Sequence, residues 1–359
     1  KKAVQEVASC QNFARYKLLM RGQKIDRGGR TASSYIVGKL KESLERLDNV
    51  GALDFDEVPE TLGVIGAGVI GLELGSVWNR LGAQVTLLEA LPDFLPLVDA
   101  DVAKQALREF KKQKLDIRLG AKVLGASVNR KKKQVTVTVD IDGEEGEMTF
   151  DRLLVCCGRR PHTEGLLAEG CGVELNERGQ IEVDETFRTS VANIFAVGDV
   201  AGGLMLAHKA TREGKVAAEV IAGQPSAFDV RAIPAVVYTD PQIAWCGLTE
   251  EEARAQNISI EIQRFPWKFS GRATTMGAPE GLTKILVDPN SGRIVGVGIC
   301  GRDTEGLISE GVLAIEMGAL AEDMALSIHP HPTLSETEGE AAELYLGSAT
   351  HILSKKKKS

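Results

Sequence analysis

The sequence has few aromatic residues, no long apolar run and no excess of positive charge. Phe, Trp and Tyr make up 5% of the 359 residues, and 43 basic residues against 50 acidic ones give a formal net charge of −7. This balance disfavours a nucleic-acid partner, whose binding surface would be basic. The longest uncharged apolar-rich run, Leu62 to Leu72, is far shorter than the ~20 residues that cross a bilayer, so we expect no membrane span.

Cysteine is also scarce, and its positions are scattered. Six cysteines in a chain of this length do not form a disulfide framework, which fits a reducing compartment. The proportions of apolar residues (43%) and charged residues (26%) are typical of a soluble globular protein. The length predicts roughly two or three domains with buried cores.

The amino-terminal segment is basic. Residues 1–41 hold ten Lys or Arg and two acidic residues, a composition typical of an organelle-targeting segment and also of a mature basic arm, the interpretation we favour. An apolar stripe at helical spacing predicts an amphipathic helix within 34–49. Such a helix packs on its own domain or docks on a partner.

Residues 61–89 have the order of a βαβ unit, which requires a parallel sheet. A buried strand over 61–65 is followed by a glycine-rich turn, a helix over 69–81 and a second strand over 84–89. The turn fits G-x-G-x-x-G, and an acidic residue, Glu89, ends the second strand. In this context the pattern predicts a dinucleotide-binding turn.

Each glycine of this turn, and the acidic residue after it, has a specific role in binding a dinucleotide. Gly66 permits the tight turn, Gly68 lets the backbone approach a diphosphate, and Gly71 lets helix and strand pack closely. The diphosphate then lies on the positive end of the helix dipole. Glu89 accepts hydrogen bonds from a ribose diol and repels a 2′-phosphate, so we expect NAD rather than NADP.

The remaining pattern indicates an α/β fold, with a Rossmann-like domain followed by an α+β domain. We expect a helix over 99–112, an antiparallel meander that includes 135–141, a strand over 153–157, a strand over 193–197 and a helix over 208–222. From about residue 228 short strands and helices mix.

From Gly51 onward the sequence resembles the dihydrolipoamide dehydrogenases of the pyridine nucleotide-disulfide oxidoreductase family. The matching stretches occur in the same order and with the same spacing as in the family. These stretches are 51–53, 64–73, 154–161, 194–200, 205–209, 238–247, 265–267, 270–273 and 329–336.

The resemblance implies two cofactors, NAD and FAD. The residues that it places at NAD are Gly66, Ala67, Gly68, Val69, Ile70, Gly71, Leu72, Glu73, Glu89, Val123 and Gly158. The residues that it places at FAD are Asp199, Met205, Leu206, Ala207 and His208.

The segment 329–336, His-Pro-His-Pro-Thr-Leu-Ser-Glu, contains the strongest candidates for reactive side chains in the sequence. By composition alone, two histidines between prolines form a metal site or are simply exposed. The resemblance implies instead that His331 is the general base for a dithiol substrate and that Glu336 orients it. A thiol with a pKa near ~8.5 needs such a base. The family uses this loop on the partner subunit's disulfide, which implies a homodimer.

The family's redox-active C-x-x-x-x-C pair and its first G-x-G-x-x-G, both in an amino-terminal FAD domain, do not occur in this sequence. Cys156-Cys157 falls in a predicted buried strand, which favours core packing. Three interpretations stay open: a piece of a complete enzyme, a missing half supplied by another chain, or a degenerate homologue. The function is therefore oxidation of protein-bound dihydrolipoamide with NAD through FAD, or a catalytically silent structural or assembly role.

We divide the chain into five parts. These are a basic arm (1–50), an NAD-binding domain (51–180), a remnant of the FAD-binding domain (181–227), a dimerisation domain (228–350) and a basic tail (351–359). The implied partners are lipoyl-bearing subunits of a 2-oxoacid dehydrogenase complex and a larger assembly bound through residues 1–50. The family and the basic start suggest the mitochondrial matrix, with plastid or cytoplasm as alternatives. We expect no metal.

Overall fold

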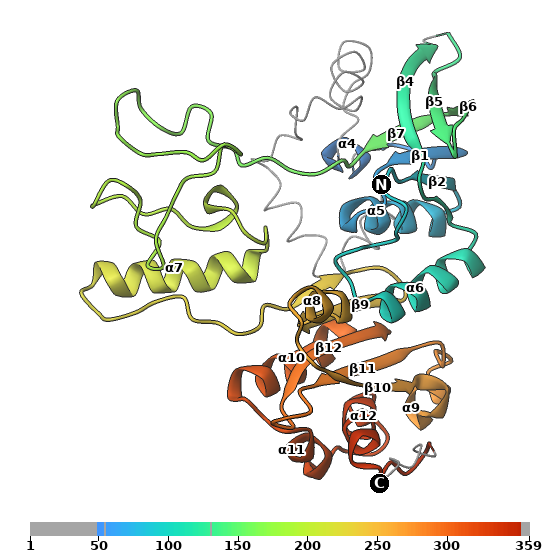
Figure 1. Cartoon of the computed structure of the whole chain (residues 1–359). Helices are drawn as coiled ribbons and strands as arrows, with labels where there is room; N and C mark the ends of the chain where they lie inside the picture. The colour runs from blue at the N-terminus through green and yellow to red at the C-terminus, as the bar shows by residue number, and fades with distance from the viewer. Residues whose placement is uncertain (1–48, 54, 130, 353–359) are drawn as a thin grey trace.

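The computed structural model describes residues 49–53, 55–129 and 131–352. An α/β unit comes first along the chain, an irregular segment with one long helix follows, and an antiparallel sheet with its helices comes last (Figure 1). Most of the helix expected at 34–49, and the tail beyond residue 352, lie outside the described residues. Within these residues, no helix is both long and apolar enough to cross a bilayer.

The α/β unit is built on a four-stranded sheet with the order β3-β2-β1-β7, in which all neighbours are parallel. This confirms the predicted βαβ unit. Its elements are α4 (Asn49–Leu53), β1 (Thr61–Ile65), α5 (Val69–Arg80), β2 (Gln84–Leu88), α6 (Ala100–Lys112), β3 (Asp116–Arg118) and β7 (Arg152–Val155).

Both faces of the parallel sheet are covered. Leu62 and Val64 of β1 point into a core shared with α5 and α6, whereas Ile65 joins the core beneath a three-stranded antiparallel sheet. The ring of Phe150 lies so close to Gly63 that a Cβ there would come within 2.6 Å of it. That antiparallel sheet, the predicted meander, consists of β4 (Lys122–Asn129), β5 (Gln134–Ile141) and β6 (Glu144–Phe150).

The carboxyl-terminal domain is a five-stranded antiparallel sheet with the order β10-β11-β12-β9-β8. It confirms the mixed α/β fold class. Helices α10 and α12 pack on this sheet, and α6 of the first unit also contacts β12 and β11. The strands are β8 (Ala235–Val237), β9 (Gln242–Gly247), β10 (Glu261–Pro266), β11 (Leu282–Val287) and β12 (Ile294–Gly301). The helices are α8 (Glu250–Ala255), η3 (Trp267–Phe269), α9 (Gly271–Thr275), α10 (Thr304–Met317), α11 (Ala321–Leu326) and α12 (Glu336–Leu346).

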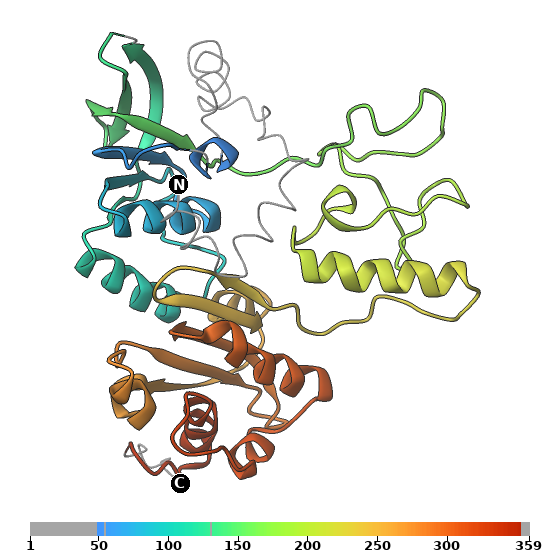
Figure 2. The ribbon, with the colours of Figure 1, turned by 180° about the vertical axis from the view of Figure 1, so that it is seen from behind.

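Between these domains, the chain from Gly158 to about residue 230 runs out to one side and carries α7 (Ala207–Ile221) (Figures 1 and 2). This helix confirms the prediction over 208–222. The strand predicted at 193–197 is wrong, because only an isolated bridge between Arg188 and Phe195 forms there. No parallel neighbour for it exists among the described residues, so its backbone groups bond within local turns instead.

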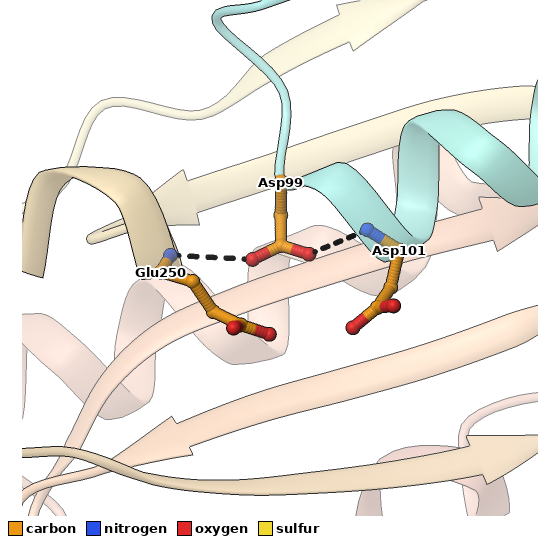
Figure 3. Close-up of side chains that lie close together, drawn as sticks. All are labelled: Asp99, Asp101 and Glu250. Carbon is orange, nitrogen blue, oxygen red and sulfur yellow. Dashed lines mark hydrogen bonds between the residues drawn. The ribbon is translucent and has the colours of Figure 1, made fainter. Parts of the chain in front are cut away.

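A buried ion-pair cluster joins the two domains. Lys284 on β11 is fully buried, and its Nζ donates to Asp99 Oδ1 at 2.6 Å, to Asp101 Oδ2 at 2.8 Å and to Glu250. Arg264 bonds the same Asp101 and Glu250 from the surface. The three carboxylates converge from α6 and α8 (Figure 3) with a spacing that would suit a metal ion, but the Lys284 ammonium already lies among them.

The cluster also stabilises its own members. Asp99 caps the start of α6 by accepting the N–H of Asp101. Burial tends to raise the pKa of Asp101, but hydrogen bonds and charge from Lys284 and Arg264 outweigh it and hold the pKa at about 2. Asp101 therefore stays ionised beside the buried ammonium, and the contacts of Lys284 with α6 and α8 hold the two domains in one arrangement.

We predict that Lys284→Met lowers the free energy of unfolding by about 3 kcal/mol or more, because buried Asp99 then loses its counter-charge. Denaturant unfolding followed by circular dichroism measures this change. Lys132→Met is the control, since Lys132 is exposed on the turn after β4. Equal, small effects of the two substitutions would contradict a stabilising role for the cluster.

Candidate active site

The glycine-rich turn leaves the carboxyl end of β1 and leads into α5. Gly66 has a φ of +99°, and a Cβ on it would lie 2.8 Å from the carbonyl oxygen of Cys156. A Cβ on Gly71 would lie 2.0 Å from the carbonyl oxygen of Gly66. Only glycine fits at either position, as the sequence pattern predicts for a tight turn and close helix packing.

Gly68 differs from the other two glycines of the motif. It is the N-cap of α5 in an extended conformation, no side chain caps the helix, and nothing lies within 4 Å of where its Cβ would be. The first turn of α5 has no acidic residue. An uncapped helix start beside open space is a suitable place for an anion, because its N–H groups and dipole attract negative charge.

Glu89 lies directly beside this turn, immediately after β2. Its Oε2 accepts the N–H of Ala67 at 2.9 Å, and its Oε1 accepts the N–H of Leu91 at 3.0 Å. The carboxylate is thus held in one place, and each oxygen keeps a further lone pair for a hydroxyl group. The structure brings the predicted acidic residue and the predicted turn together.

Other predicted dinucleotide residues gather at the same edge. From β1 the chain continues to β2 and β3 on one side of the sheet and later returns to β7 on the other side. The strand order therefore reverses between β1 and β7, and dinucleotides bind at the carboxyl ends of strands at such a switch point. Gly158 follows β7 with a φ of +98°, and Val123 lies at the start of β4, two residues after Ala121 bonds the carbonyl of Glu89.

The strand predicted over 153–157 ends earlier, at Val155. Cys156 is half-buried and Cys157 is exposed at the carboxyl edge, so the prediction that both pack in a core is wrong for Cys157. The chain turns away after Val155 to reach Gly158, and this leaves Cys157 outside the sheet. Its Sγ donates to the carbonyl of Ile65 at 3.5 Å.

Within α5 the predicted residues differ in surroundings. Val69 and Ile70 are half-buried at the start of the helix, whereas Leu72 is fully buried in the core. Glu73 is 3% exposed, and its Oε1 accepts the N–H of Tyr238 at 2.9 Å. Its carboxylate thus connects α5 to the end of β8, a contact that the sequence did not reveal.

The residues predicted to bind FAD lie around the start of α7. Asp199 lies in the short helix η2 (Gly198–Ala201), and Arg159 donates to the carbonyl of Met205 at 3.0 Å with its other nitrogen 3.9 Å from Asp199 Oδ2. Leu206 is the N-cap of α7, Ala207 is its first residue, and the His208 ring bonds the carbonyl of Pro234.

Glu213 also lies at this place, although no motif in the sequence marked it. It is buried on α7, accepts the N–H of Gly198 at 2.6 Å and pairs with Lys209. An acidic residue four positions after a lysine on a helix was the available signal. The pair holds the Gly198-Asp199 turn against α7.

His331 and Glu336 form the predicted pair. His331 Nδ1 lies 2.8 Å from Glu336 Oε1, and Glu336 Oε2 accepts the N–H of Thr333 at 2.7 Å. Burial tends to raise the pKa of Glu336, but the hydrogen bonds from Thr333 and His331 outweigh it and hold that pKa below its ordinary value. The His331 side chain is 71% exposed, so its ring is open to solvent.

Glu336 is the first residue of α12, which lies well apart from α5 in both views (Figures 1 and 2). One chain therefore does not bring the His–Glu pair to the glycine-rich turn. His329, the other histidine of the motif, is neither exposed nor among metal-type ligands, because its ring is mostly buried and bonds Glu310 on α10.

These features define a dinucleotide-binding α/β protein whose second domain carries an exposed His–carboxylate pair. Residues 27–214 match the family model described as pyridine nucleotide-disulphide oxidoreductase, and residues 233–342 match the dimerisation domain of the same family. The chain belongs to the pyridine nucleotide-disulphide oxidoreductase family. Its members are flavoproteins that use FAD and NAD(P).

Curated relatives agree with this assignment. A dihydrolipoyl dehydrogenase from Thermus scotoductus is 41% identical over 98% of this chain and 78% of that protein. One from Halobacterium salinarum is 43% identical over 86% of this chain and 65% of that protein. Among solved structures, the HOCl-induced flavoprotein disulfide reductase RclA from Escherichia coli matches with a TM-score of 0.76 and 31% identity, over 83% of this chain and 67% of that one.

Two consequences follow from these matches. The chain spans about two thirds of the length of the Halobacterium enzyme and of the solved reductase. The relatives come from bacteria and an archaeon, so they give no support to the mitochondrial matrix that the sequence suggested.

Glu338, two residues after Glu336, is a buried acid without a hydrogen bond to either oxygen in the described part of the chain. Burial and the charge of Glu310 raise its pKa well above 4.5. At pH values between 4.5 and the raised folded-state pKa, the folded protein keeps Glu338 protonated, whereas the unfolded chain releases this proton. The contribution of Glu338 to the free energy of unfolding is therefore fully present below pH 4.5. It is lost as the pH rises toward the folded-state pKa, because the unfolded chain is then favoured by ionisation.

We predict that Glu338→Gln, which cannot ionise, becomes more stable relative to the wild type by up to about 1.4 kcal/mol per pH unit across that range. Denaturant unfolding at several pH values measures the difference. Glu322→Gln on the exposed face of α11 is the control and should show no such slope. A difference between wild type and Glu338→Gln that is independent of pH would show that Glu338 is ionised in the folded protein.

Proposed function

We propose that this chain carries the NAD-binding and acid–base parts of a dihydrolipoamide dehydrogenase. The observation that carries the proposal is the 2.8 Å hydrogen bond between His331 and Glu336 on an exposed loop of the dimerisation domain. A base of this kind suits a dithiol, whose thiols are weak nucleophiles until a proton is removed.

In this reaction His331 takes the proton of one substrate thiol on its exposed ring nitrogen. Glu336 holds the other ring nitrogen, fixes the tautomer and stabilises the imidazolium that forms. Overall, the dithiol loses two electrons and two protons to become a disulfide, while NAD⁺ gains a hydride and one proton is released. FAD, when bound, supplies the step that relays these electrons.

NAD is the nucleotide that the glycine-rich turn supports best. The diphosphate lies at the start of α5 beside Gly68, and Glu89 accepts hydrogen bonds from the ribose diol. A 2′-phosphate would bring negative charge onto a carboxylate that is already fixed in place. Asp199, the segment 205–208 and Arg159 provide the polar groups that would hold FAD.

The active unit is a homodimer, which the match to a dimerisation domain supports. Four large apolar side chains of this domain are left in solvent by one copy, two on α10, one at the end of α11 and one just before the His331 loop. They are Leu313 (62% exposed), Met317 (75%), Leu326 (73%) and Ile328 (99%). Covering this surface with a second copy would bring the exposed His331 loop beside the partner subunit, as the resemblance implies.

We retain the five-part division of the chain and the lipoyl-bearing subunits of a 2-oxoacid dehydrogenase complex as partners. A second candidate function is a catalytically silent structural subunit, favoured by the lack of a C-x-x-x-x-C pair in the sequence. Flavin absorbance of the purified protein together with lipoamide-dependent NADH formation supports the enzyme. A colourless protein without this activity supports the structural role.

We predict that Glu89→Ala weakens NAD⁺ binding by about tenfold, because the ribose loses a charge-assisted acceptor. The same change should reduce discrimination against NADP⁺. Calorimetric titration with both nucleotides measures these effects. Glu60→Ala is the control, since Glu60 is exposed at the opposite edge of the sheet. An unchanged NAD⁺ affinity in Glu89→Ala would exclude the ribose contact.

We predict that His331→Gln reduces dihydrolipoamide oxidation by about 10²-fold or more, because the substrate thiol loses its base. Transfer of electrons from NADH to a dye does not need this base and should continue. The two activities, assayed on one preparation, give the comparison. An equal loss of both would contradict the role assigned to His331.

A further inference from the structure

A second histidine–carboxylate pair lies beside the proposed base. His329 Nε2 lies 2.8 Å from Glu310 Oε1, and the His329 side chain is only 12% exposed, whereas that of His331 is 71% exposed. Glu310 belongs to α10, and it is 19 residues away in sequence. This hydrogen bond therefore connects the His331 loop to α10, a helix that is not adjacent to the loop in the sequence.

The other side of the His329 ring is set by α12. A Cβ on Gly339 would lie 2.8 Å from His329 Nδ1 and 3.0 Å from its Cε1, so the ring rests against the backbone of this helix. His329 is thus held between Glu310 on one helix and Gly339 on the next. Any larger side chain at residue 339 would displace the imidazole.

The loop that carries His331 is consequently held at two places. At its end, Glu336 accepts from Thr333 N–H and bonds His331 Nδ1. At its start, His329 is the fixed residue, and one proline, whose φ is restricted, separates it from His331. Because so little freedom remains between the two histidines, a shift of His329 would move the His331 ring away from Glu336.

We propose that Glu310 and His329 form a positioning pair that fixes the His331 loop between α10 and α12, so that His331 keeps its hydrogen bond to Glu336. This inference rests on the proposed function for its catalytic consequence only. The role assigned to these two residues involves no contact with the substrate. Their effect is on orientation, and a misplacement of about 1 Å can cost up to ~10²-fold in rate.

The test compares Glu310→Ala with the conservative Glu310→Gln, whose amide oxygen can still accept from the His329 ring. Glu305→Gln, an exposed carboxylate on the same helix, is the control. Gly339→Ala is a second, independent perturbation from the α12 side. The protein has five histidines, so ring ¹⁵N spectra of histidine-labelled full-length chain can be assigned. Dihydrolipoamide turnover is measured on the same preparations.

In Glu310→Ala and Gly339→Ala we expect the hydrogen-bonded Nδ1 signal of His331 to move toward that of a free imidazole. We expect kcat to fall about tenfold with the KM for NAD⁺ unchanged. Glu310→Gln and Glu305→Gln should retain the wild-type spectrum and kcat. Folded Ala variants with an unchanged His331 signal would overturn the positioning role.

The spectra and the rates separate the two proposals. A wild-type chain with no dihydrolipoamide turnover would contradict the proposed function, while the His331 signals would still decide the positioning role. If Glu310→Ala does not fold, Gly339→Ala decides the question, because alanine is well accepted within a helix. A shift of the His331 signal in Glu305→Gln as large as in Glu310→Ala would also overturn the specific role of Glu310.

Discussion

The site at the carboxyl edge depends on one steric constraint, the close approach of β1, α5 and β7 around two glycines. A Cβ on Gly71 would come within 2.0 Å of the Gly66 carbonyl oxygen, and one on Gly66 within 2.8 Å of that of Cys156. This approach aims the start of α5 at the edge of the sheet. It also places the turn within hydrogen-bonding distance of Glu89, so the turn and the acid form one site.

The glycine-rich turn and the His331–Glu336 pair lie on separate domains, and buried polar contacts fix the domains against each other. Lys284 binds three carboxylates from α6 and α8, and Glu73 of α5 accepts the N–H of Tyr238. The His–Glu pair nevertheless remains far from α5 within one chain. A second copy is therefore part of the proposed mechanism, and the exposed apolar side chains of α10 face solvent in its absence.

Local patterns predicted the βαβ unit, because strand 61–65, the glycine motif and helix 69–81 are specified by neighbouring residues. The pairing of His331 with Glu336 came from the family resemblance, and the structure supplied its geometry. The strand expected at 193–197 failed, since a parallel strand needs partners that the described residues do not provide. The roles of Lys284 and Glu310 could not be predicted, because their partners are distant in sequence and no periodicity marks them.

The proposed function depends on a diphosphate bound beside Gly68 at the start of α5. Calorimetric titration of NAD⁺ into the wild type and Gly68→Ala tests it most directly. The added methyl group meets nothing within 4 Å in the protein, so thermal stability should not change. We predict that NAD⁺ affinity falls by about tenfold or more, because the methyl group occupies the space the diphosphate needs. Equal affinity of the two proteins would contradict it.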